Sequence, residues 1–133
     1  MPGLVLKLRD GERVLINGAV IEASGRGCKL RVLTPGTDIL RMRDAIDPRE
    51  ATTPVARLAH LLQMIVAGAV DRDDAVMEAT MMLDALHDAF VEAIDLDVIR
   101  TVREEVGAGR PYPALRALAP LRAREADIFA KAG

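Results

Sequence analysis

Two kinds of hydrophobic pattern divide the chain near residue 48. Through the first part, apolar and polar residues alternate in short runs, the period of a half-buried β-strand. Turns separate the runs, and Asn17-Gly18 favours a tight hairpin because both residues tolerate a positive φ. The pattern predicts a small antiparallel sheet or barrel with short strands at residues 4–9, 13–16, 19–22, 28–33 and 38–43.

The rest of the chain carries apolar residues at three- and four-residue steps, the spacing of amphipathic helices. Thr53 followed by Pro54 is typical of a helix start, and acidic residues at 71–74 favour a second one because the helix dipole stabilises negative charge there. The pattern predicts about four helices: one that ends at Gly68, one from the acidic start to Ile94, one at about 96–106, and a last stretch from Pro111 that Pro120 kinks or divides.

We therefore expect an α+β protein with an antiparallel β module at residues 1–48 and a helical bundle at residues 49–133. The net charge of −2 excludes a uniformly basic protein. However, residues 1–50 hold nine Lys or Arg against seven Asp or Glu, whereas residues 51–133 hold nine against thirteen. Such asymmetry can mark an anionic partner for the basic part.

Basic residues share one phase of the predicted strands. If the alternating apolar residues from Leu4 to Met42 face inward, including Leu40, every charged residue in the outward phase is basic. These residues are Lys7, Arg9, Arg13, Lys29, Arg31, Arg41 and Arg43. Arg26, between two glycines, could also approach a phosphate closely. The pattern indicates a phosphate-binding surface; the alternative is an ordinary solvated sheet face.

Other compositional features exclude several classes of protein. The three aromatic residues are too few for a module that stacks RNA bases on aromatic platforms. The single cysteine, Cys28, precludes an internal disulfide, which fits a reducing compartment, and we expect it to be buried. No apolar stretch is long enough to cross a bilayer and no signal peptide is evident, so the sequence predicts a cytoplasmic protein without membrane contact.

Catalytic candidates are few, and we expect neither an enzyme nor a cofactor. Ser24 is the only serine and there are two histidines, so the chain offers few residues that could form a nucleophile–base pair. Asp84, His87 and Asp88 could share a helix face as a metal site. However, His87 lies on the predicted apolar stripe, which favours a core histidine instead.

Several segments resemble the FlbT family over nearly the whole chain. The run from Leu6 to Val20, LKLRDGERVLINGAV, is similar to the family's opening, and ILRMRDAI at 39–46 followed by EATTP at 50–54 continues the similarity. Later, GRPYPAL at 109–115 and Arg124-Glu125 resemble the family's last segments. No single motif is unique, but their order and spacing are specific.

This resemblance implies a post-transcriptional regulator of flagellum biogenesis. Members associate with the 5′ untranslated region of flagellin mRNA and promote its degradation, and a companion protein, FlaF, acts in the same circuit. Some members activate instead of repressing. The expected partners are therefore the flagellin mRNA 5′ untranslated region, with FlaF and flagellin as further candidates.

A weaker resemblance concerns the first third of the chain. The carbon storage regulator family also opens with a strand and an Arg-x-Gly-Glu turn, and its Arg-Glu-x-Ile is similar to Arg43-Asp44-Ala45-Ile46. In that family, basic residues on the first and fifth strands bind RNA in a strand-exchanged dimer. By position, the resemblance implies RNA contacts at Arg9 and Arg43.

Our hypothesis is an mRNA-binding β module joined to an acidic helical part. The helical part would recruit a protein partner or mediate a homodimer. The alternative is a flagellin- or FlaF-binding chaperone that affects mRNA only indirectly. On the RNA hypothesis, reversing the charges of Arg41 and Arg43 should abolish RNA binding while folding is retained.

Overall fold

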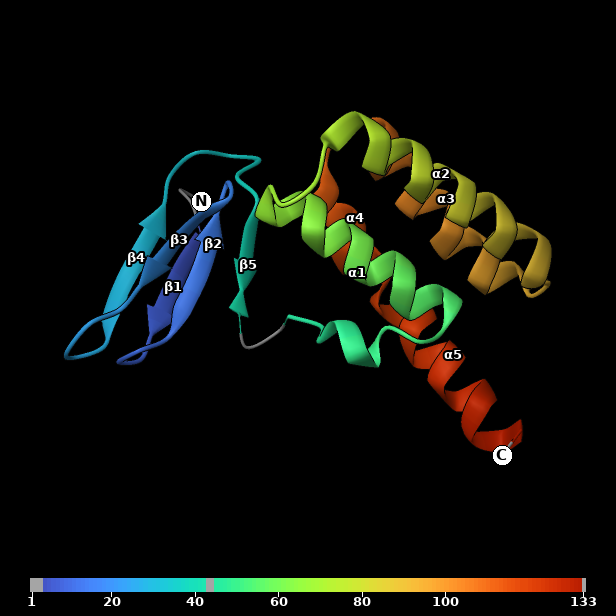
Figure 1. The fold of residues 1–133 in the computed structure, drawn as a ribbon, viewed down its shortest axis with the longest axis horizontal. Coiled ribbons are helices and arrows are strands. Elements are labelled where there is room, and N and C mark those ends of the chain that lie inside the picture. The colour runs from blue at the N-terminus through green and yellow to red at the C-terminus, as the bar shows by residue number, and fades with distance from the viewer. Residues whose placement is uncertain (1–3, 43–44, 133) are drawn as a thin grey trace.

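The computed structural model describes residues 4–42 and 45–132 and shows an α+β protein, as predicted. The β strands lie at one end of the molecule and the helices at the other (Figure 1). The strands form two antiparallel sheets, β1–β4 and β3–β2–β5, rather than one. Their bounds are β1 (Leu4–Leu8), β2 (Arg13–Ile16), β3 (Ala19–Glu22), β4 (Cys28–Val32) and β5 (Ile39–Arg41).

The predicted hairpin joins β2 to β3. Asn17 and Gly18 have φ values of 50° and 82°, and Ile16 pairs with Ala19 across the turn. Both turn residues adopt the left-handed conformation that a type I′ turn requires. The turn also rests on the helices, because a Cβ added to Gly18 would meet the Ala67 carbonyl oxygen at 3.4 Å.

A small core fills the space between the two sheets. Leu6 and Leu8 from β1 pack there with Val14, Ala23 and Ile39. The predicted inward phase is therefore confirmed for Leu6 and Leu8 of β1 and for β2, whereas Leu4, at the start of β1, is exposed. It is wrong for β5: Ile39 occupies the core between the sheets, and Leu40 points from the other face of its sheet toward the helices. Met42, also expected inward, is exposed.

The helical part begins with a short 3₁₀ helix, η2 (Pro48–Glu50), whose N-cap is Asp47. The Arg49 side chain donates hydrogen bonds to the Asp47 carboxylate and thereby lowers the pKa of Asp47. The helices that follow are α1 (Pro54–Ala67), α2 (Arg72–Ala89), α3 (Ala93–Gly107), α4 (Pro111–Ala117) and α5 (Ala119–Ala132).

Sequence signals placed most helix ends correctly. The Thr53 hydroxyl caps α1, Gly68 ends it in a left-handed conformation, and the Asp71 carboxylate caps α2. The second helix ends at Ala89, before the predicted end at Ile94, because the backbone of Phe90 is extended. Ile94 therefore belongs to α3. The division near Pro120 is confirmed, since α4 ends before it and α5 contains it.

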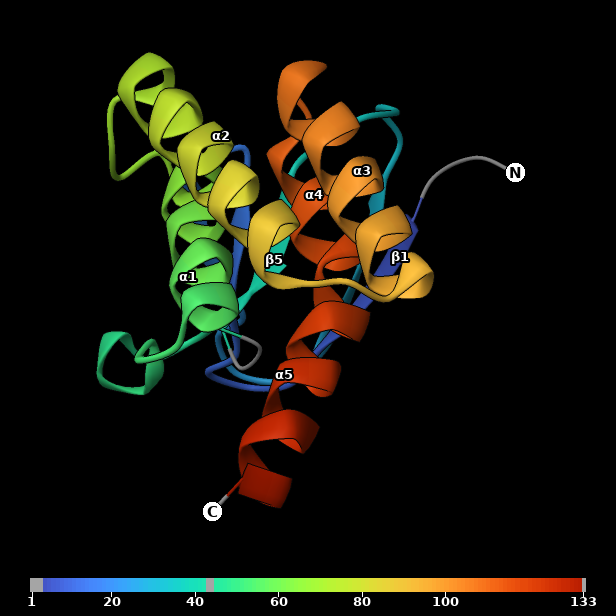
Figure 2. The same ribbon diagram turned by 90° about the vertical axis from the view of Figure 1, so that its right-hand side faces the viewer.

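Helices α1 to α4 pack as a bundle in which α1 contacts α2 and α4, and α3 contacts the same two helices. Its core includes Leu58, Leu62, Leu83 and Ile99, all fully buried. Helix α5 extends beyond the bundle (Figure 2). Midway along α5, the buried Glu125 carboxylate accepts hydrogen bonds from the Thr53 hydroxyl and from the Val55 backbone N–H at 3.0 Å, so α5 helps to cap α1.

The β strands are packed directly on the helical bundle. Leu15 and Leu40, on the outer face of the three-stranded sheet, form a buried cluster with Val66 of α1. The Gln63 side chain, also buried, accepts a hydrogen bond from the Ile46 N–H at 2.7 Å and donates one to the Ile46 carbonyl at 3.2 Å. This packing leaves the sheet β1–β4 on the far side of the strands from the helices (Figure 1).

Candidate nucleic-acid interface

The outer face of sheet β1–β4 is basic. Lys7 pairs with Lys29 across the strands, and Val5 pairs with Arg31 on the same face. The alternate residues, such as Leu6 and Leu30, point to the core side. Like charges opposite each other destabilise a sheet, so this pairing costs free energy in the isolated protein. Bound anions would offset that cost.

Two further cations, Arg9 and Arg26, lie at one end of this sheet. Arg9 follows β1 directly, and Arg26 lies in the turn between β3 and β4. The two turns are joined, because the Asp10 carboxylate accepts a hydrogen bond from the Gly25 N–H at 2.9 Å. Gly27 is required at this point, since an added Cβ would lie 2.6 Å from the Leu8 carbonyl oxygen.

These five cations are exposed, and none has an ion pair within residues 4–42 and 45–132. We call them the basic face; its members are Lys7, Arg9, Arg26, Lys29 and Arg31. A solvated surface usually mixes both signs of charge. A cluster of one sign with free guanidinium and ammonium groups can bind phosphates, through bidentate hydrogen bonds in the case of arginine.

Arg13 lies elsewhere. It belongs to β2, in the other sheet, and points to the same side as Leu15 and away from the core between the sheets. Its guanidinium pairs with Glu22 of β3 at 2.8 Å. Among the described residues, the single basic face that alternation predicted is therefore divided between two sheets.

Arg41 also departs from the predicted face. It shares a side of the three-stranded sheet with Val14 and points toward β1, where its Nη2 donates a hydrogen bond to the Lys7 carbonyl at 2.6 Å. Its Nε is buried and lacks a hydrogen-bond partner among the described residues. Arg41 therefore joins the two sheets. Arg43 lies outside the described residues.

An open hollow adjoins the basic face. It has a volume of about 540 Å³, and its lining includes Lys7, Arg9, Glu12 and the partly buried Arg41. Arg41 thus remains near the basic face although it does not belong to it. Alternation along one strand could not reveal this hollow, because β1 and β5 meet only through tertiary packing.

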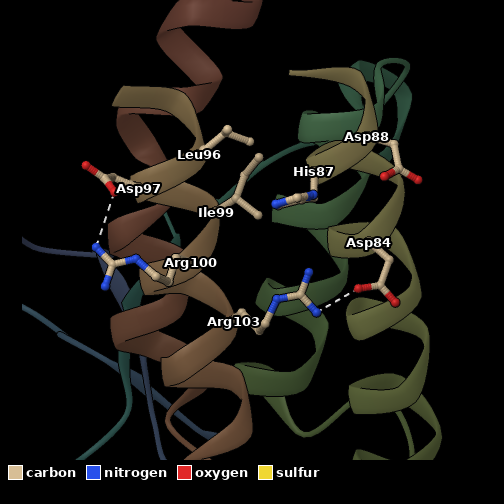
Figure 3. A pocket seen from close by; sticks show the side chains of 8 residues that line it. All are labelled: Asp84, His87, Asp88, Leu96, Asp97, Ile99, Arg100 and Arg103. Carbon is tan, nitrogen blue, oxygen red and sulfur yellow. Dashed lines mark hydrogen bonds and ion pairs between the residues drawn. The ribbon is translucent and has the colours of Figure 1, made fainter. Parts of the chain in front are cut away.

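The acidic and histidine side chains of α2 do not converge on a metal-like site. Asp84 pairs with Arg103 of α3 at 2.7 Å, and Asp88 lines the same hollow between α2 and α3 (Figure 3). His87 is exposed rather than part of the core. In the described ranges, no group of three His, Cys, Asp or Glu residues could hold a metal ion. Cys28 is also exposed, contrary to expectation.

A second hollow lies between α2 and α5. This apolar groove has a volume of about 580 Å³, and its lining includes Met82, Phe90, Val91, Ile128 and Phe129. The last three are exposed. Sequence patterning did not identify the groove, because it forms only where α5 passes the end of α2. Over the part of the chain that the structure describes, no helix is long and apolar enough to cross a membrane.

Comparisons with known proteins place the chain in a family. The family described as "Flagellar protein FlbT" matches residues 4–129. A relative from Brucella anthropi, named "Probable flagellum biosynthesis repressor protein FlbT", is 33% identical over 96% of this chain and 83% of its own length. Relatives of the same name from Brucella ovis and Brucella suis are 33% identical over 93% of the chain and 80% of theirs. No solved structure matches. The chain belongs to the FlbT family of flagellar proteins.

Proposed function

We propose that this protein is a regulator of flagellum biogenesis that acts on flagellin mRNA after transcription. In this proposal the basic face binds the 5′ untranslated region of that mRNA, and cellular nucleases then degrade the message. Family membership supports the regulatory role, since the relatives are named as probable flagellum biosynthesis repressors. One structural observation supports the RNA role: the cations of the basic face are exposed, adjacent and without ion pairs in the described part of the chain.

The chemistry of the basic face favours RNA phosphates as its ligands. Lys7, Lys29 and Arg31 project from a two-stranded antiparallel ribbon, where same-face neighbours along one strand lie about 6.7 Å apart. No aromatic residue occurs in the strands, so bases cannot stack there as they do on aromatic RNA-binding sheets. Binding would rest on phosphate contacts, and arginine contacts to base edges would add selectivity.

The test is a titration of the purified protein with the 5′ untranslated region of its own flagellin mRNA. A scrambled RNA of the same length is the control, and both are measured at low and at physiological salt. We expect selective binding that weakens steeply with salt, because phosphate neutralisation releases counterions. Equal binding to both RNAs, or none to either, would contradict a direct role in mRNA recognition.

The apolar groove supports a second candidate function, an adaptor that binds FlaF or flagellin and influences mRNA indirectly. Exposed Val91, Ile128 and Phe129 around this groove are the observation in its favour. Burial of apolar surface is less sensitive to salt than phosphate binding is. A complex with FlaF or flagellin that persists at high salt, in a protein that does not select its RNA, would favour the adaptor.

A further inference from the structure

The β strands leave one side of their two-sheet arrangement open. Strand β5, at one edge of the three-stranded sheet, is joined to β1 by the hydrogen bond from Arg41 to Lys7. Strand β3 forms the opposite edge, and no described strand pairs with its outer side. All of its residues are exposed, including the apolar Val20 at 63% and Ile21 at 36%.

The register shows which backbone groups face this open edge. In a two-residue hairpin, the residues flanking the turn, here Ile16 and Ala19, exchange hydrogen bonds. Hydrogen-bonded and non-hydrogen-bonded pairs alternate along an antiparallel ladder, so Val14 and Ile21 form the next hydrogen-bonded pair. The N–H and C=O groups of Val20 and Glu22 therefore point away from β2.

Strand β3 lacks the features that usually protect an edge. Natural edge strands carry lysine, proline or a bulge that discourages pairing with another chain. The only charged residue of β3 is Glu22, and Arg13 neutralises it at 2.8 Å. By contrast, β4 carries Lys29 and Arg31, which would repel an identical strand. Of these two strands, β3 is the better suited to pairing with a copy of itself.

We propose that β3 pairs antiparallel with β3 of a second copy of this chain, about a two-fold axis at Ile21. In this register Val20 lies opposite Glu22 of the second copy, and all the outward backbone groups of both residues find partners. A register centred on Val20 or on Glu22 would place some of these groups opposite turn residues. Ile21 faces its own counterpart, so the two apolar side chains cover each other. Glu22 of each copy keeps its Arg13 partner.

This pairing joins the three-stranded sheets of two copies into one continuous sheet. Because antiparallel strands related by a two-fold axis keep the same faces on the same side, the basic faces of both copies would lie on one side of the dimer. A role for these two faces in RNA binding rests on the proposed function. The pairing of the two β3 strands does not. It assigns the dimer contact to the β strands, whereas the sequence-based hypothesis gave the helical part either a protein partner or this contact.

Disulfide trapping tests the register directly. In a Cys28→Ser background, Ile21→Cys places two thiols in a non-hydrogen-bonded pair, where Cα atoms lie about 4.5 Å apart and a disulfide can form. Val20→Cys is the matched control, since its two thiols would lie on a diagonal about 7–8 Å long, and exposed Met77→Cys on α2 is a remote control. We expect mild oxidation to link Ile21→Cys into dimers far faster than either control. Equal rates for Ile21→Cys and Met77→Cys would overturn the proposal.

A second variant tests the edge hydrogen bonds in the protein without added cysteines. Val20→Pro removes an N–H that faces the open edge, whereas Val20→Thr keeps it with a side chain of similar size. The interface is small, so we expect micromolar association by sedimentation equilibrium, weakened about tenfold or more by Val20→Pro and little by Val20→Thr.

A protein that stays monomeric at high micromolar concentration would also overturn the proposal, as would a dimer that both variants leave unchanged. A dimer that both variants leave unchanged would indicate that the dimer contact lies on the helices. Circular dichroism and thermal unfolding check that both variants fold. All of these measurements are made without RNA, so a failure of mRNA binding cannot be mistaken for a failure of the pairing.

Discussion

On helices α2, α3 and α5, most basic side chains are paired with carboxylates, whereas those of the basic face are not. Arg72, Arg100, Arg103, Arg124 and Lys131 each lie within 4.0 Å of a carboxylate oxygen. Arg57, Arg116 and Arg122, on α1, α4 and α5, have no such partner among the described residues. The helical cations therefore serve mainly internal contacts, while those of the basic face have no carboxylate partner among the described residues.

The difference teaches that counting charges is not enough to locate an anion site. Residues 51–133 hold as many basic residues as residues 1–50 do. In residues 51–133, however, acidic neighbours neutralise most of them. On β1 and β4, basic residues face one another, and the strand geometry keeps them on one side.

The largest effect is expected from the helical core and should leave RNA binding intact. Leu83→Ala removes a fully buried side chain between helices and should lower the free energy of unfolding by about 3 kcal/mol. Urea denaturation measures this loss. RNA affinity, measured below the unfolding transition, should stay unchanged; a parallel loss of affinity would mean that the helices take part in RNA binding.

Charge reversal on the basic face should weaken RNA binding about a hundredfold. Lys29→Glu with Arg31→Glu removes two phosphate partners and adds two repulsive charges, so the salt dependence should also become shallower. The matched control is Arg100→Glu with Lys131→Glu on the helices, which changes the net charge equally. Titration with the flagellin 5′ untranslated region should show little effect of the control. Similar losses in both variants would indicate a nonspecific response to net charge.

Arg41 should matter more for stability than for RNA. Arg41→Met removes the hydrogen bond to the Lys7 carbonyl while keeping much of the apolar stem, and should lower the free energy of unfolding by about 1.5 kcal/mol. Its effect on RNA affinity should be smaller than that of the reversal on β4. This expectation replaces the prediction that reversing Arg41 and Arg43 would spare folding. A variant that is fully stable but binds no RNA would place Arg41 in the interface after all.

The smallest effect is expected at the groove between α2 and α3. Asp84→Asn weakens an exposed ion pair with Arg103, so the free energy of unfolding should fall by about 0.5 kcal/mol or less. Thermal unfolding at low and high salt measures it, and the difference from the native protein should shrink at high salt. A loss several times larger would show that this pair holds the two helices together.

Local sequence signals predicted the elements well because their causes are local. The hairpin at Asn17-Gly18 depends on positive φ values, and the α1 boundaries depend on the Thr53 cap and on Gly68. The end of α2 was missed because apolar spacing continues from Phe90 to Ile94 while the backbone turns away at Phe90. Periodicity reports which residues are apolar, and it does not show where the chain changes direction.

The candidate site was predicted in part. Lys7, Lys29 and Arg31 share the predicted face because β1 and β4 are neighbours and alternate in the same phase. Arg13 and Arg41 do not share it, because β2 and β5 belong to a second sheet. A strand that packs on both sides has no solvent face, so Leu40 and Arg41 could not be assigned by alternation alone.

By itself, the sequence determined the division into strands and helices, most of their ends, and the excess of basic residues in the first part of the chain. These follow from backbone preferences and short-range spacing. Only the tertiary structure decided which cations remain free, which one is drawn between the sheets, and which edge stays open. Those outcomes depend on which strands become neighbours, because a charge is neutralised or left exposed by residues that are distant in the sequence.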